Sequence, residues 1–230
     1  MKHVVVLSGA GMSADSGLAT FRDSGGLWEG YDINEVATIA GWNRDPEQVL
    51  EFYNQRRRQA FEAKPNAGHL AIAELEKEFE VSIITQNVDD LHERAGSSNV
   101  LHLHGELRKA RSEKNRTLIY DIGADPIQPG DTAEDGAQLR PHVVWFGERV
   151  PMMEEAVEIV QKTDILIVIG TSLVVYPAAG LVDYAPHSIP KFIVDPSTPE
   201  LQNMKDWEHI KKTAAEGTPA LAEKISNEYG

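Results

Sequence analysis

The chain contains no cysteine among its 230 residues. Disulfide bonds, a thiol nucleophile and thiolate metal ligands are therefore excluded, which fits a reducing compartment. Basic residues are also scarce, since 22 Lys and Arg face 36 Asp and Glu and the formal net charge is −14. Because nucleic-acid binding needs a net basic face, we do not expect DNA or RNA as a partner. The balance suits a cytoplasmic protein with basic partners such as lysine-rich proteins.

Long hydrophobic runs are absent as well. The longest apolar region, "DILIVIGTSLVVYPAAGLV" from Asp164, is interrupted by Gly170, Thr171, Ser172 and Pro177. It is typical of a buried strand, a loop and a helix start rather than of a membrane span. The N-terminal "MKHVVVLSGAG" lacks the apolar stretch and cleavage site of a signal peptide. We therefore expect neither a secretory leader nor a membrane partner.

Short continuous apolar runs alternate with helical patterns along the chain. Such runs indicate strands buried on both faces, hence a parallel sheet with crossover helices. The predicted fold class is α/β, a doubly wound, Rossmann-like parallel sheet. Helices are expected at Asn66–Glu78 and Met152–Lys162. The expected strands are "HVVVLS", "VSIIT", "NVLHLH", "HVVWF", "DILIVIG" and "KFIVD".

Two segments break this alternation. Roughly 21–61 is helical and rich in loops, and 107–140 is polar, acidic and full of turn residues. We predict one domain over 1–230, with a Rossmann-like part of about 1–20, 62–106 and 141–230. A small helical subdomain would comprise about 21–61 and 107–140. The cleft between the two parts would open at the carboxyl ends of the strands, where ligands bind in open α/β sheets.

A glycine-rich turn follows the first predicted strand. In "VVVLSGAGMSADSG", Gly9, Gly11 and Ala14 have the G-x-G-x-x-G/A spacing. This spacing lets backbone N–H groups approach a pyrophosphate at a helix N-terminus, so it predicts dinucleotide binding, with a plain structural turn as the alternative. No acidic residue ends a second strand about 20 residues further on, which disfavours an ordinary dehydrogenase.

Five stretches are notable together: "GAGMSADSGLATFRD" (9–23), "TQNVDDLHERAG" (85–96), "LHGEL" (103–107), "PHVVWFGE" (141–148) and "GTSLVVYPAAG" (170–180). In this order they resemble the sirtuins, which are NAD-dependent protein-lysine deacylases. The resemblance implies NAD as cofactor and acyl-lysine proteins or peptides as substrates. It also implies that the acyl oxygen attacks C1′ of the nicotinamide ribose, that nicotinamide leaves, and that the products are free lysine and 2′-O-acyl-ADP-ribose.

His104 matches the catalytic base of the family, in the motif "LHG". The resemblance implies that it deprotonates a ribose hydroxyl, and imidazole can take up a proton near neutral pH. A lone histidine at the end of a strand is more often structural, which is our interpretation of His102 and His142. The two alternatives to deacylation are mono-ADP-ribosyl transfer to a protein nucleophile and a non-enzymatic NAD or ADP-ribose sensor. The sequence leaves the oligomeric state open.

The implied NAD site draws on several loops. Gln86 and Asn87 would bind a ribose, with Asn87 also catalytic, and Asp89 would bind the carboxamide of nicotinamide. Stabilisation of the first turn of the next helix is the alternative for Asp89 and Asp90, and it suits Asp90 better. The aspartate at position 195, where many sirtuins have asparagine, would repel the 2′-phosphate of NADP. The other implied cofactor contacts are Gly9, Ala10, Gly11, Ala14, Phe21, Arg22, Gly170, Thr171, Ser172, Asp195 and Ala214.

The most basic run of the chain is "EFYNQRRRQA" (51–60). It belongs to a predicted helix with Asp45 as N-cap. At 3.6 residues per turn, Tyr53 and Arg56 share the inward face, Arg57 lies at its margin and Arg58 points to solvent. An inward arginine needs a partner, and a structural acid such as Glu35 is the alternative to a ligand.

The pattern Tyr53-x-x-Arg56, with Ala37 upstream, resembles the class III sirtuins, which remove succinyl and malonyl groups. It implies a desuccinylase or demalonylase that also removes acetyl groups. Ala37 would leave room for the acyl chain, and Tyr53 and Arg56 would bind its distal carboxylate. "VVWFGE" and "SLVVYP" would clasp the peptide as an added strand. The peptide contacts implied are Val144, Phe146, Gly147, Val174 and Tyr176.

The chain departs from the family pattern at one point. Most sirtuins carry two Cys-x-x-Cys pairs that bind a structural zinc, and the first pair would fall near Ser112 and Asn115. Structural zinc sites use mainly thiolates and imidazoles, and 107–140 contains neither cysteine nor histidine. We therefore predict no zinc, and a small subdomain held by packing through "TLIYDI" (117–122).

Overall fold

The computed structural model describes residues 1–20, 27–28, 30–199 and 204–230. Its larger part is a six-stranded parallel sheet with the strand order β11-β10-β9-β1-β4-β5. This confirms the predicted doubly wound α/β fold. The strands are β1 (His3–Ser8), β4 (Glu80–Thr85), β5 (Val100–His102), β9 (Ile165–Ile169), β10 (Lys191–Val194) and β11 (Glu208–Ile210).

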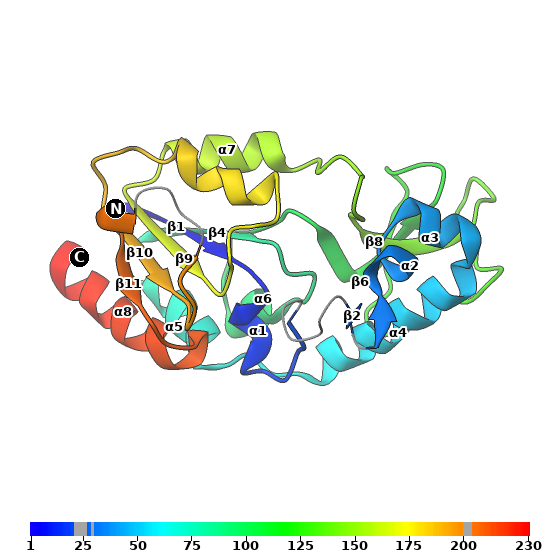
Figure 1. Ribbon diagram of the computed structural model, residues 1–230, viewed down its shortest axis with the longest axis horizontal. Coiled ribbons are helices and arrows are strands. Elements are labelled where there is room, and N and C mark those ends of the chain that lie inside the picture. The colour runs from blue at the N-terminus through cyan, green and yellow to red at the C-terminus, as the bar shows by residue number, and fades with distance from the viewer. Residues whose placement is uncertain (21–26, 29, 200–203) are drawn as a thin grey trace.

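Both faces of this sheet are covered by helices (Figure 1). Val4 and Val6 of β1 pack into one apolar layer with α5 (Ala67–Leu75) and α8 (Ala214–Tyr229). Val5 and Leu7 point to the other layer, under α7 (Met153–Gln161) and the 3₁₀ helix η1 (Ala178–Tyr184). Burial on both faces explains why the strand is apolar throughout. The short helices α1 (Gly11–Ala14) and α6 (Leu91–Ala95) follow β1 and β4.

The prediction of the sheet's strands was wrong at two places. "HVVWF" does not enter the parallel sheet, because its residues supply the end of β8 (Leu139–Val143), which pairs antiparallel with β6 (Gly105–Ser112). Its apolar character comes from packing in the small subdomain, where Val143 and Trp145 are buried. The parallel sheet instead includes the edge strand β11, which is only three residues long and polar, so no apolar run marked it.

The small subdomain lies at the opposite end of the molecule from both termini (Figure 1). It contains a three-stranded antiparallel sheet, β7-β6-β8, which we did not expect in a helical insertion. One apolar cluster joins this sheet to the neighbouring helices, with Phe52 and Trp145 among its largest members. The other elements of the small subdomain are β2 (Leu27–Trp28), β3 (Tyr31–Asp32), α2 (Ile33–Val36), α3 (Ile39–Arg44), α4 (Pro46–Glu62) and β7 (Ile119–Asp121). Outside this subdomain, the short 3₁₀ helix η2 (Met204–Asp206) precedes β11.

A buried charge cluster fastens the strands of the small subdomain. The carboxylate of Glu148 contacts Arg140 at 3.0 Å, Arg111 at 3.3 Å and Arg116 at 3.0 Å. The Glu148, Arg140 and Arg111 side chains are 4%, 3% and 6% exposed, so three cationic groups share one nearly buried anion. We refer to Glu148, Arg111, Arg116 and Arg140 as the Glu148 cluster. It joins β6 and β8 to the segment that follows β8.

Near the position where other sirtuins would have their first cysteine pair, the side chain of Ser112 makes hydrogen bonds within the protein. Its hydroxyl donates to Asp135 at 2.7 Å and accepts the backbone N–H groups of Lys114 and Asn115. Within the described ranges, no three His, Cys, Asp or Glu side chains are grouped so as to hold a metal ion. The segment 117–122, through which we expected the small subdomain to pack, contributes little to its core. Ile122 packs partly buried on the apolar cluster, whereas Ile119 is 43% exposed.

Helix α4 starts as predicted, with the Asp45 carboxylate accepting the N–H of Gln48 at 2.9 Å. The prediction for Arg57 was wrong, because its side chain is fully buried rather than marginal. Its guanidinium donates to the carbonyl of Leu107 at 2.6 Å and to Asn54 at 2.7 Å. Since α4 packs on β6 as well as on α2 and α3, its buried side is wider than one stripe.

The other arginines of α4 lie where the periodicity placed them. Arg56 is buried at 9% exposure, whereas the side chain of Arg58 is 60% exposed. Glu35, the alternative partner for Arg56, forms its ion pair with Arg44 at 3.1 Å instead. In the described part of the chain, no helix is long and apolar enough to cross a membrane.

Candidate active site

A cavity of about 530 Å³ lies between the carboxyl ends of the parallel strands and the small subdomain. Among the predicted site residues that the structure describes, Ala214 does not line it. Phe21 and Arg22 lie outside the described residues, and Ala214 is buried behind Thr213, which does line the cavity. All the others do: Gly9, Ala10, Gly11, Ala14, Ala37, Tyr53, Arg56, Gln86, Asn87, Asp89, His104, Val144, Phe146, Gly147, Gly170, Thr171, Ser172, Val174, Tyr176 and Asp195.

The glycine turn after β1 packs directly on the loop after β9. A Cβ atom on Gly11 would lie 2.7 Å from the Cα of Gly170, and Gly170 itself has a positive φ of 63°. The N–H groups of Gly9 and Gly11 donate to the carbonyls of Ile169 and Gly170. The close contact between the two loops therefore requires glycine at these positions. The N–H groups of Gly9 and Gly11, which we expected at a pyrophosphate, donate to carbonyls of the protein itself.

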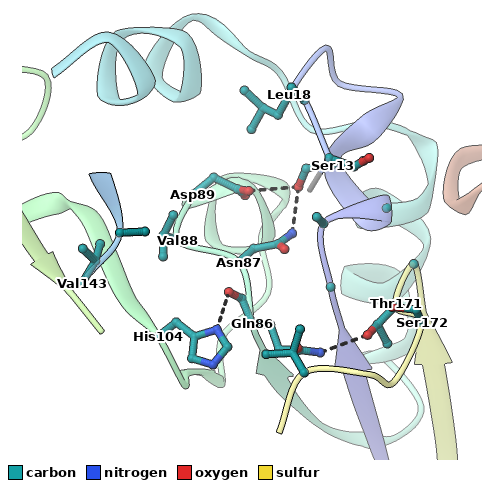
Figure 2. Close-up of a pocket in the computed structure, with 18 of the residues that line it drawn as sticks. Ser13, Leu18, Gln86, Asn87, Val88, Asp89, His104, Val143, Thr171 and Ser172 are labelled. Atoms are coloured by element: carbon teal, nitrogen blue, oxygen red, sulfur yellow. Dashed lines mark hydrogen bonds between the residues drawn. The ribbon is translucent and has the colours of Figure 1, made fainter. Parts of the chain in front are cut away.

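The loop after β4 projects polar side chains into the cavity, and Ser13 of α1 holds them together (Figure 2). The hydroxyl of Ser13 donates to the carboxylate of Asp89 at 3.0 Å and accepts the amide of Asn87 at 3.1 Å. Asn87 and Asp89 are only 7% and 8% exposed. Burial raises the pKa of Asp89, against the hydrogen bonds from Leu91 and Ser13, which lower it.

Asp89 also has the structural role that we judged unsuitable for it. Its carboxylate accepts the N–H of Leu91 at the start of α6, whereas Asp90, the N-cap residue, makes no side-chain capping bond. Asp90 still places its charge at the N-terminus of α6, but the hydrogen bond to the first turn is made by Asp89, which we did not expect. Because one oxygen of Asp89 binds α6 and the other binds Ser13, its carboxylate is fixed in orientation inside the cavity wall.

The orientation of His104 follows from one hydrogen bond. Its Nδ1 lies 3.1 Å from the carbonyl oxygen of Gln86 (Figure 2). A carbonyl only accepts, so Nδ1 carries the proton and Nε2 keeps the basic lone pair. Burial lowers the pKa of His104, and the bond to Gln86 partly offsets this effect. The imidazole is therefore neutral, and able to accept a proton, at physiological pH.

His102, two residues before His104, has a structural environment, as we expected. Its Nδ1 lies 3.0 Å from the carbonyl of Asn87 and its Nε2 lies 2.7 Å from the carboxylate of Glu93. Burial would lower the pKa of His102, but the hydrogen bond and charge of Glu93 outweigh it and the pKa is raised. The ring thereby ties α6 to the loop that bears Asn87.

The cavity wall on the β9–β10 side carries hydroxyl groups and one carboxylate. The side-chain amide of Gln86 donates to the hydroxyl of Thr171 at 3.2 Å (Figure 2). Asp195, directly after β10, is 3% exposed and accepts the N–H of Ser197 at 2.8 Å. This half of the cavity thus offers acceptors and donors suited to hydroxyl groups.

The opposite end of the cavity is formed by the small subdomain. Tyr53 and Arg56 of α4 line it together with Ala37, the C-cap residue of α2. The Tyr53 side chain is 3% exposed, and its hydroxyl accepts the indole N–H of Trp145 at 3.1 Å. Burial raises the pKa of Tyr53 to about 12, so the phenol stays protonated.

Exposed apolar side chains lie at the mouth of the cavity. Phe146, Val174 and Tyr176 line it yet are 47%, 48% and 74% exposed. The amides of Val144 and Phe146 donate to the carbonyls of His104 and Ala37, and the amide of Trp145 donates to Glu148. These three amides are therefore not available to a bound peptide strand.

Sequence reasoning did not name two residues that the structure places in the cavity wall. Ser13 joins Asn87 to Asp89, and Trp145 contacts Tyr53. Both lie within stretches of the sequence that carry the sirtuin resemblance, but neither is titratable at neutral pH and no spacing distinguishes them. Only the folded arrangement brings their partners, 74 to 92 residues away in the chain, within hydrogen-bonding distance.

Comparison with known proteins agrees with this geometry. A model of the Sir2 family matches residues 9–177. The chain is 54% identical over 225 residues to an NAD-dependent protein deacylase of Helicobacter pylori (strain J99), covering 98% of this chain and 96% of that one. It therefore belongs to the Sir2 family, and the predicted membership of the sirtuins is confirmed.

Solved structures show the same fold. The crystal structure of a Sir2 homolog–NAD complex has a TM-score of 0.88 and 40% identity, covering 98% of this chain and 90% of that chain. A mutant Sir2 homologue bound to 2′-O-acetyl ADP ribose also has a TM-score of 0.88, with 39% identity and coverage of 98% and 92%.

Proposed function

We propose that this protein is an NAD-dependent protein-lysine deacylase that removes negatively charged acyl groups, succinyl and malonyl, as well as acetyl groups. Its relatives named as NAD-dependent protein deacylases support the reaction class. The observation that carries the acyl preference is that Arg56 and Tyr53 line the same cavity as His104. The guanidinium of Arg56 and the hydroxyl of Tyr53 thus face the cavity that also contains the proposed base, His104.

The residues present fit NAD. Gln86, Thr171, Ser172 and Asp195 would hold its riboses and phosphates with amide, hydroxyl and carboxylate groups, and Asp89 would face its carboxamide. The buried carboxylate of Asp195 would disfavour the extra phosphate of NADP by charge repulsion. When bound, NAD supplies an electrophilic ribose carbon with nicotinamide as its leaving group.

The chain's own contribution to the chemistry is mainly proton transfer and orientation. His104 holds its Nδ1 proton against the carbonyl of Gln86 and would accept a proton at Nε2. Asn87 and Asp89 are fixed by their common partner Ser13 before any ligand arrives. Such preorganisation avoids the cost of ordering these side chains during the reaction. Phe146, Val174 and Tyr176 would cover the apolar stem of the lysine and its peptide.

The charged end of the acyl group would meet Tyr53 and Arg56. A guanidinium offers paired donors that match a carboxylate, and low exposure of both side chains reduces competition by water. A charge-assisted hydrogen bond contributes about 1.5–3 kcal/mol, which is roughly a tenfold to hundredfold preference. Ala37 leaves space in this end of the cavity that a larger side chain would fill.

The test compares Arg56→Met with Arg58→Met, a control on the same helix whose side chain is exposed. We expect Arg56→Met to lower kcat/KM for succinyl-lysine peptides about tenfold to hundredfold, with acetyl-lysine activity changed much less. Arg58→Met should leave both unchanged. Nicotinamide release and peptide mass are followed together, because release without loss of the acyl group would indicate ADP-ribosyl transfer instead. Equal losses on both peptides would defeat the proposed acyl preference.

A further inference from the structure

The hydroxyl of Tyr53 has a fixed hydrogen-bonding direction. Among the residues that the structure describes, its hydrogen-bond partner is the indole N–H of Trp145, with Nε1 3.1 Å from the phenolic oxygen. An indole N–H can only donate, so the phenolic oxygen must be the acceptor. The single O–H proton of Tyr53 is then left to donate in another direction, and Tyr53 lines the cavity.

Trp145 is held in place from several sides. The guanidinium of Arg140 lies over its ring, 3.2 Å from the ring centroid, and Trp42 packs against it with centroids 5.6 Å apart. Its backbone N–H donates to the carboxylate of Glu148, which also binds Arg140. The Trp145 side chain is 2% exposed. The indole therefore presents its N–H to Tyr53 with little freedom to rotate.

The charge pattern around the pair favours an anionic ligand beyond it. Arg56 lies one helical turn after Tyr53 and lines the same cavity. The carboxylate of Glu148, the acid of the Glu148 cluster, is engaged by three arginines. Burial keeps the phenol of Tyr53 protonated. A donor O–H and a guanidinium thus face the cavity side by side.

We propose that Trp145 is a positioning residue for acyl selectivity: by donating its indole N–H to the Tyr53 oxygen, it aims the Tyr53 hydroxyl proton at the distal carboxylate of the acyl group. This inference rests on the proposed function. Without the indole N–H, the phenol can turn its proton toward the vacated site, and the donor beside Arg56 is lost for part of the time. An acetyl group has no distal carboxylate to accept this hydrogen bond, so its removal should not depend on Trp145.

The experiment is a double-mutant cycle on the full chain. We measure kcat and KM for succinyl-lysine and acetyl-lysine peptides with wild type, Trp145→Phe, Tyr53→Phe and the double variant. Trp42→Phe is the matched control, because Trp42 belongs to the same buried cluster but its indole N–H binds Glu113 rather than Tyr53. Where Trp145→Phe folds poorly, 3-benzothienylalanine at position 145 keeps the indole shape and removes only the N–H.

We expect Trp145→Phe to raise KM for the succinyl peptide and lower the succinyl-to-acetyl ratio of kcat/KM about threefold to tenfold, the effect of one neutral hydrogen bond. In the Tyr53→Phe background, the same change should leave the ratio unaltered. An unaltered ratio in Trp145→Phe, an equal fall in Trp42→Phe, or a further fall in the double variant would overturn the inference.

Failure of this inference is distinguishable from failure of the proposed function. If Arg56→Met lowers the succinyl-to-acetyl ratio while Trp145→Phe does not, the carboxylate pocket exists and only the role of Trp145 is wrong. If the wild-type protein does not act on succinyl-lysine peptides, both are overturned.

Discussion

Replacing Glu148 by glutamine should destabilise the small subdomain strongly. The substitution keeps the shape of the side chain but removes the one anion shared by Arg140, Arg111 and Arg116. The first two of these arginines are 3% and 6% exposed, so their charges would remain buried without a counterion. Removing one partner of a buried ion pair costs about 3–5 kcal/mol.

Glutamine can still accept one hydrogen bond, so the lower end of this range, about 3 kcal/mol, is the expected loss. That is a large part of the 5–15 kcal/mol by which folded domains are usually stable. With an m-value of about 3 kcal/mol/M, the urea midpoint should fall by about 1 M. Tryptophan fluorescence reports the transition, because Trp145 and Trp42 lie in the small subdomain core.

Glu154→Gln is the matched control for this measurement. Glu154 pairs with Arg149 at 2.7 Å, but these side chains are 83% and 76% exposed. Exposed pairs contribute about 0–1 kcal/mol, so the control should unfold near the wild-type midpoint. If Glu148→Gln unfolds at the same urea concentration as Glu154→Gln, the Glu148 cluster does not hold the subdomain and the reasoning fails.

The contribution of Glu148 should also depend on pH in a defined direction. Burial alone would raise the pKa of its carboxyl, but the hydrogen bonds and charges of Arg140 and its neighbours hold it below the usual 4.5. The folded state therefore keeps the carboxylate ionised to lower pH than the unfolded chain does. The stability difference between wild type and Glu148→Gln should be complete above pH 4.5 and shrink as the pH falls through the lower folded value.

Two further predictions concern histidines. Replacing His104 by alanine should lower deacylation about 10²–10⁴-fold, the usual contribution of a general base, with NAD binding by calorimetry nearly unchanged; a fully active variant would contradict the assignment. His69 is fully buried and accepts the N–H of Asn66, and burial lowers its pKa from 6.5 to about 4. Because the unfolded chain binds this proton first, acidification from pH 7 to 5 should cost about 2 kcal/mol of stability through His69. In urea unfolding, His69→Gln should lose less stability over this interval than the exposed His187→Gln, and equal losses would count against the role of His69.

The parts of the site that depend on one local segment were predictable from the sequence. The glycines at 9 and 11 follow a strand, and their spacing places them at the carboxyl edge of the sheet. His104 and Gln86 likewise follow predicted strands, so parallel pairing brings them to the same edge. Tyr53 and Arg56 share a helical face whatever surrounds the helix. In each case the local sequence pattern, a strand end or a helical period, determines where the side chain lies.

The parts that depend on packing between distant segments were not predictable. Arg57 can be buried because its guanidinium donates hydrogen bonds to the carbonyl of Leu107 and to the side chain of Asn54. The run "HVVWF" forms the end of an antiparallel strand because β6 pairs with it. Periodicity describes one segment at a time, whereas these outcomes are decided by a second segment some 40 to 50 residues away.

The Glu148 cluster links the stability of the small subdomain to the geometry of the cavity. In addition to the apolar packing of this subdomain, a buried anion joins β6 and β8 to the segment after them. That segment is also tied by its amides to the carbonyls of His104 and Ala37, at 2.9 Å in each case. It therefore reaches from the proposed base to the proposed acyl pocket. Because Glu148 fixes the backbone of Trp145, the group that stabilises this subdomain also constrains the spacing between these two parts of the site.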